Sequence, residues 1–137
     1  MATWELKKYD VPGRNIVNTE GFGLATVEDV RELTEYVVTK GKSFGGKWGY
    51  IPMMEKMDPI YDPETQKEFA KLHKACEEAG CIAMAFVAGG MATIKVQAKR
   101  HEKASQAEKI ATRYFKTREE ALFLYHNEGF TALRALP

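Results

Sequence analysis

The segment GCIAMAFVAGGMATIKVQAKR, which runs from Gly80 to Arg100, decides how this sequence is interpreted. Residues Cys81 to Ala88 are apolar without alternation, as is typical of a parallel strand that helices cover on both faces. The strand ends at Gly89-Gly90. The part that follows, within Met91 to Glu108, is rich in Ala, Lys, Gln and Glu and favours a helix. An alternating apolar pattern keeps a strand open as the alternative there. The residues that alternate are Ile94, Val96 and Ala98.

Two amphipathic helices are predicted before this strand. The first occupies TVEDVRELTEYVVTKG, with Thr26 as its N-cap, Asp29 at the third helical position and Gly41 just beyond its end. The second runs from about Pro63 to Ala79, with an Asp cap before the proline, and stops at Gly80. Each helix has an apolar stripe. The stripe residues are Val27, Val30, Leu33, Val37 and Val38 in the first helix and Phe69, Leu72 and Cys76 in the second.

The N-terminal part predicts an antiparallel hairpin. Trp4 and Leu6 alternate with polar residues, and DVPG is a turn signal. The segment NIVNTE, from Asn15 to Glu20, forms the second strand. Another strand, WGYIPM, lies between the two helices and ends at Pro52.

The C-terminal part predicts a further strand and helix. Ile110 to Phe115 form the strand. Thr117 and Glu120 have the spacing of a capping box, in which each side chain bonds the other residue's backbone N–H. The helix that they open runs to about Asn127.

This order of elements predicts an α/β fold with a mixed four- or five-stranded sheet. The N-terminal antiparallel hairpin is followed by β-α-β-α-β-α crossovers. We expect a single domain over residues 1–137, in which residues 128–137 form a C-terminal extension. Ligands of such sheets bind at the carboxyl ends of the strands. Three segments meet there: EGFG, the methionine-rich loop after Ile51, and Gly89-Gly90.

The composition restricts the class of protein. The chain has 137 residues, of which 45% are hydrophobic and 28% charged, with a formal net charge of +1. A charge near zero provides no general attraction to nucleic acid, so no nucleic-acid partner is expected. No apolar run reaches the ~20 residues of a membrane span. The start of the chain lacks a secretory pattern, and Cys76 and Cys81 match no disulfide scaffold. We therefore expect a cytoplasmic protein.

The run KIATRYFKTREEALFLY, with GCIAMAFVAGG and a strand–loop–helix unit before it, resembles the STAS-like domains, in particular their bacterial SpoIIAA-like branch. The resemblance covers about Asn15 to Asn127. It implies a mixed sheet packed with helices that recognises a protein or a small ligand and has no catalytic function. Classical members have a phosphorylatable Ser or Thr where the second helix begins. The corresponding turn here has Thr65 as its only hydroxyl, and the neighbouring Asp62 and Glu64 would repel a phosphate.

The loop IPMMEKMDPIYD is the main candidate for a binding site. Met53, Met54 and Met57, with Ile60 and Tyr61, place flexible apolar side chains at the expected ligand end of the sheet. We expect this loop to form one wall of an apolar pocket or a contact patch for a partner. The alternative is that these residues fold back over the core.

Gly89 and Gly90 form the second candidate, an anion site. If a helix begins near Met91, its free N–H groups would face the strand ends, and Lys95 would add a positive charge. The alternative is that the basic segment 95–113 is simply the solvated face of a helix.

The residues give less support for a metal site, a catalytic site or a nucleotide site. His73, Cys76 and Cys81 have a spacing that zinc could use, but both cysteines fall on apolar positions and are expected in the core. His101 and His126 have no visible companion acid or nucleophile. The glycines of GFGLAT suit a tight turn. No catalytic residue, metal or cofactor is predicted.

Together these features predict a non-enzymatic binding or regulatory module that recognises a protein partner. The alternative is a carrier of a small hydrophobic or anionic ligand, in a pocket at the carboxyl ends of the strands. An enzyme with its active site at the same strand ends is a third possibility. The tail FTALRALP places Phe130, Leu133 and Leu136 at a regular spacing, so it either covers the domain's own sheet or docks on a second copy of the chain. We predict a homodimer.

Overall fold

The computed structural model describes residues 4–89, 103 and 110–123. These residues form one five-stranded sheet in the order β1-β2-β3-β4-β5. The strands are β1 (Glu5–Tyr9), β2 (Ile16–Phe22), β3 (Trp48–Met53), β4 (Cys81–Val87) and β5 (Ala111–Phe115). β1 is antiparallel to β2, and every later pair is parallel. The predicted α/β fold, with its hairpin and mixed sheet, is therefore confirmed.

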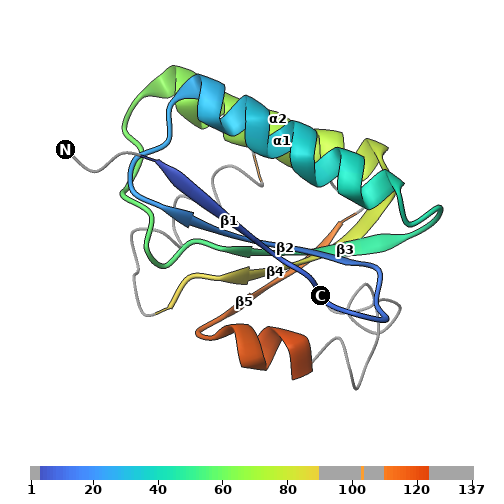
Figure 1. Cartoon of the computed structure of the whole chain (residues 1–137). Helices are drawn as coiled ribbons and strands as arrows, with labels where there is room; N and C mark the ends of the chain where they lie inside the picture. The colour runs from blue at the N-terminus through green and yellow to red at the C-terminus, as the bar shows by residue number, and fades with distance from the viewer. Residues whose placement is uncertain (1–3, 90–102, 104–109, 124–137) are drawn as a thin grey trace.

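Helices cover both faces of this sheet. α1 (Val27–Lys42) and α2 (Pro63–Glu78) lie side by side over one face, and the helix at residues 118–123 lies against the other (Figure 1). Each face has its own apolar cluster. Val17, Tyr50 and Phe86 pack with α1 and α2, whereas Ile16, Ile51 and Ala85 pack with Ala121 of the last helix. This double cover explains why the sequence of β4 is apolar throughout.

The helix ends follow the predicted capping pattern with one exception. Thr26 and Asp29 form a capping box at the start of α1, and Gly80 follows the end of α2 with φ +103°. Gly41, however, does not end α1. It is buried within the last turn, where a Cβ would overlap the indole of Trp48. The helix continues to Lys42 and is capped by Ser43.

Two further predictions about the elements are changed or left open. β3 continues through Pro52 to Met53, one residue beyond the predicted end. β3 and β4 pair at Tyr50 and again at Met53, but not at Ile51 and Pro52 between them. A proline lacks the N–H that a ladder needs, which accounts for the gap. The predicted helix within 91–108 lies outside the described residues, except for Lys103, which is helical.

Candidate functional site

The glycine and methionine segments meet at the carboxyl ends of the parallel strands, as the sequence predicts. Gly23, just beyond β2, forms an isolated parallel bridge with Met57. Its N–H donates to Lys56 O at 3.2 Å, and its carbonyl accepts from the N–H of Asp58 at 2.9 Å. On the other side, the N–H of Met54 donates to Val87 O at 2.8 Å. These bonds attach the loop of residues 54–58, which we name the methionine loop, to both β2 and β4.

The hairpin also reaches this end of the sheet through Trp4. Its indole lies directly on Gly21, where a Cβ would overlap the ring and would stand 3.1 Å from Met57 Cγ. Only glycine leaves room for the ring at this position. Trp4, Gly21 and Met57 therefore form a packed contact between β1, β2 and the methionine loop.

A small cavity lies beneath this contact, between the sheet and the α1–α2 layer. Its volume is about 50 Å³, and its walls come from four strands, both of these helices and the methionine loop. Met53, Met54 and Met57 all contribute to its lining, although the side chain of Met53 packs in the apolar cluster on the opposite face of the sheet. The alternative that they cover the core is also correct for Met53 and Met57, which are buried in the two apolar clusters.

One pair of hydroxyl groups faces this apolar environment. Thr19 Oγ1 and Tyr50 Oη lie 2.7 Å apart, both residues are almost fully buried, and both line the cavity. The two side chains are diagonal neighbours on adjacent strands, since Val17 is the register partner of Tyr50. Burial raises the pKa of Tyr50, so its phenol stays protonated and remains a hydrogen-bond donor.

A carboxylate side chain lies at the position where the anion site was predicted, beside Gly89. Gly89 has φ +59°, and a Cβ added to it would stand 2.5 Å from Cδ of Glu55. The space beside this glycine is thus occupied by an acidic side chain, which repels a phosphate or another carboxylate. Gly90 and Lys95 lie outside the described residues.

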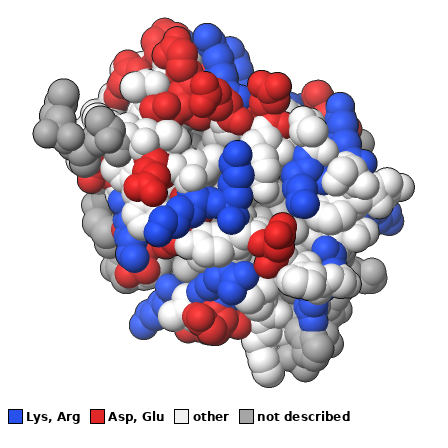
Figure 2. Space-filling model, viewed as in Figure 1, with Lys and Arg blue, Asp and Glu red and all other residues white. Residues whose placement is uncertain are grey.

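Tyr61 does not belong to the cavity. Its side chain is 77% exposed and borders a separate, open groove of about 720 Å³ between the first turns of α1 and α2. Leu24, 44% exposed, also lines this groove. Figure 2 shows Asp and Glu side chains gathered at the upper left, over the end of the helix layer where both helices begin. The acidic residues among the described lining of the groove are Glu28, Asp62 and Glu64.

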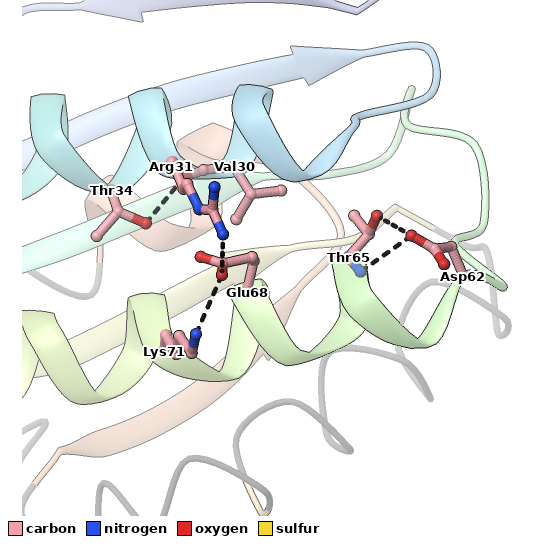
Figure 3. Close-up of polar contacts among 7 residues, drawn as sticks. All are labelled: Val30, Arg31, Thr34, Asp62, Thr65, Glu68 and Lys71. Atoms are coloured by element: carbon pink, nitrogen blue, oxygen red, sulfur yellow. Dashed lines mark hydrogen bonds and ion pairs between the residues drawn. The ribbon is translucent and has the colours of Figure 1, made fainter.

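The hydroxyl of Thr65 is committed to capping α2. Thr65 Oγ1 donates to Asp62 Oδ2 at 2.6 Å, and the backbone N–H of Thr65 donates to the same oxygen at 3.2 Å (Figure 3). The residue is 3% exposed. The hydroxyl of Thr65 is therefore buried and already bonded in the folded chain.

One turn further along α2, Glu68 connects the two helices. It accepts from Arg31 of α1 at 3.3 Å and from Lys71 at 3.2 Å (Figure 3). Burial raises the pKa of Glu68, but the hydrogen bonds from Lys71 and Arg31 outweigh it and lower the pKa overall. This bridge holds one border of the groove in place.

The cysteines are core residues, as predicted. Cys76 and Cys81 are free thiols and almost fully buried. Burial raises the pKa of Cys81 to about 12 and the pKa of Cys76 well above its usual value. Within residues 4–89, 103 and 110–123, no cluster of His, Cys, Asp and Glu has the geometry of a metal site.

A polar cluster on the opposite face of the sheet was not predicted. Asn18 is completely buried in β2; its side-chain amide donates to Ile51 O at 2.9 Å and its Oδ1 accepts from Arg118 Nε at 2.7 Å. The Arg118 guanidinium also lies over the ring of Tyr9, whose hydroxyl donates to Glu20 at 2.7 Å. The only signal in the sequence was an Asn inside an otherwise buried strand.

Comparison with models of known protein families finds no match, and a search of curated proteins finds no relative. The helices in the described part of the chain are each too short or too polar to cross a membrane.

Proposed function

We propose that this protein is a non-enzymatic binding or regulatory module of the STAS-like type, and that it recognises a protein partner through the groove between α1 and α2. The observation that carries the proposal is the position of Leu24 and Tyr61. The described residues hold only three large exposed apolar side chains, and two of them border this one groove. Exposed apolar groups that cluster in this way mark sites of protein association.

The charge of the groove indicates the chemistry of the partner. Among the residues that the structure describes, Glu28, Asp62 and Glu64 line it against one cation, Arg31, which is paired with Glu68. A segment with an apolar side chain between Lys or Arg residues complements such a surface. The acidic groups also suit the positive ends of the two helix dipoles, so part of their role is structural.

Peptide binding tests this proposal directly. Fluorescence anisotropy would compare peptides that have a central Leu between lysines with the same peptides in which Glu replaces each Lys. We expect binding of the basic peptides alone, weakened by about tenfold in Tyr61→Ser and Leu24→Ser. Phe123→Ser is the matched control, because Phe123 is 70% exposed and does not line the groove. Equal binding of the acidic peptides, or equal loss in Phe123→Ser, would contradict the proposal.

A carrier of a small hydrophobic ligand is the second candidate, and the methionine-lined cavity favours it. Its volume of about 50 Å³ is well below the roughly 300–1,000 Å³ of pockets that enclose drug-sized ligands. A carrier of this type would therefore take a small molecule and not a lipid.

Self-association through the tail is proposed separately. Phe130, Leu133 and Leu136 lie outside the described residues, so the proposal rests on their spacing. Light scattering on chains that end at Asn127 and at Pro137 tests it. A dimer only for the longer chain supports a homodimer through the tail, and a monomer in both cases rejects it.

A further inference from the structure

The hydroxyl pair in the cavity can donate one more hydrogen bond than it uses. Thr19 and Tyr50 each have one hydroxyl proton, and the bond between their oxygens uses only one of the two. Among the described residues, neither hydroxyl forms a second hydrogen bond. Burying a hydroxyl proton without an acceptor is unfavourable. The pair is therefore suited to donate to a molecule inside the cavity.

The rest of the lining defines what that molecule can be. Leu33, Phe69 and Phe86 are typical of walls that are mainly aliphatic and aromatic, and the lining residues that the structure describes include no Lys or Arg. Among these described lining residues, the titratable side chains other than Tyr50 are Asp58 and His73. The Asp58 carboxylate would repel a carboxylate or phosphate, and a molecule with several polar groups would lose its hydration. A neutral molecule with one acceptor atom matches this lining.

The size of the cavity sets the upper limit. About 50 Å³ holds on the order of four water-sized groups, since each needs roughly 10–15 Å³. The methionine wall extends this limit, because unbranched methionine side chains adapt their shape to a neighbour. Pro52, which also lines the cavity, lies at the gap in the β3–β4 ladder.

We propose that the cavity beneath the methionine loop binds a small neutral aliphatic molecule with a single carbonyl group, and that the Thr19–Tyr50 hydroxyl pair donates a hydrogen bond to the carbonyl oxygen. The apolar part of the ligand contacts Met54 and Met57. This inference rests on the ligand-carrier alternative described above and gives that ligand its chemical class. It is independent of binding at the groove.

The test uses two probes and one paired variant. Protein labelled with ¹³C at the methionine methyl groups is titrated with 2-butanone, and separately with xenon, which reports an apolar cavity without hydrogen bonding. The variant Thr19→Val/Tyr50→Phe removes both hydroxyls and keeps the shape of both side chains. Such paired replacement is close to neutral for stability, so the variant is expected to fold.

In the wild type, 2-butanone should shift the methyl signals of Met54 and Met57 in a saturable manner. The paired variant should weaken 2-butanone binding by at least about fivefold, which is the usual value of one hydrogen bond, and should bind xenon as before. If xenon binds and 2-butanone binds equally well to both proteins, the proposed hydrogen bond from the hydroxyl pair is refuted. The function as a carrier of an apolar ligand would then be retained. If neither probe shifts a signal, the cavity holds water only, and both the inference and the carrier function are overturned.

Discussion

Gly23 and Met57 form a parallel β-bridge that lies beyond the end of β2 and joins the methionine loop to the sheet. The bridge places the loop over the cavity, between the hairpin on one side and β4 on the other. Gly23 has φ +81°, a conformation that favours glycine. The glycine at this position thus turns the chain toward α1 and also anchors a loop that comes much later in the sequence.

The contact between Gly41 and Trp48 should be sensitive to a single methyl group. A Cβ at Gly41 would overlap the buried indole, so Gly41→Ala should lower the free energy of unfolding by about 1–3 kcal/mol. Helix propensity alone would raise it by up to about 1 kcal/mol. Urea denaturation measures the difference. Gly46→Ala is the matched control, because nothing lies within 4 Å of a Cβ there. Equal stability of the two variants would refute the close contact.

The bond between Arg118 and Asn18 should contribute to stability. Arg118→Ala leaves the buried Oδ1 of Asn18 without this donor, so we expect a loss of about 1–3 kcal/mol. Lys116→Ala, an exposed cation near the same helix, should change stability by less than about 0.5 kcal/mol. A double-mutant cycle with Asn18→Ala isolates the pair, and a coupling energy near zero would contradict this account.

The cap of α2 should make stability depend on pH. The hydrogen bond from Thr65 lowers the pKa of Asp62 in the folded protein. A carboxyl with a lowered folded pKa stabilises the fold above its unfolded pKa, near 4, and this contribution is lost as the pH falls through the folded value. In Asp62→Asn, urea midpoints should therefore fall less between pH 6 and pH 2 than in the wild type. Identical pH curves would show that Asp62 does not form this cap.

The two cysteines should be unreactive until the protein unfolds. Because the pKa of Cys81 is raised to about 12 and both thiols are buried, almost no thiolate exists at pH 8. Ellman's reagent should find no thiol in the native protein and both in urea. Rapid labelling of Cys76 or Cys81 under native conditions would place it at the surface instead.

The sequence predicted the elements better than their contacts. Local patterns were sufficient for the capping residue Thr26, the hairpin turn and the apolar strand after Gly80, since each depends on neighbouring residues. The contacts of Gly41 with Trp48, Glu55 with Gly89, and Arg118 with Asn18 join distant parts of the chain. The spacing of apolar residues in the sequence does not indicate such long-range contacts.

The same limit applies to the candidate site. The methionines were correctly expected near the ends of the strands, because the carboxyl ends of parallel strands share one edge. Tyr61 was grouped with them because it lies close in sequence. The start of α2 instead places it in the groove with Leu24. The hydroxyl pair was missed, since Thr19 and Tyr50 belong to strands whose register the sequence does not specify.

The central claim is that the hairpin, the methionine loop and the helix layer close one cavity at this end of the sheet. A nuclear Overhauser measurement between the methyl group of Met57 and the indole protons of Trp4 tests it most directly, with methionine-methyl and tryptophan labelling in the full chain. We expect clear cross-peaks, which Gly21→Val should weaken or remove, because its side chain would displace Trp4. A Met57 methyl signal at its random-coil position without a cross-peak to Trp4 would contradict the account.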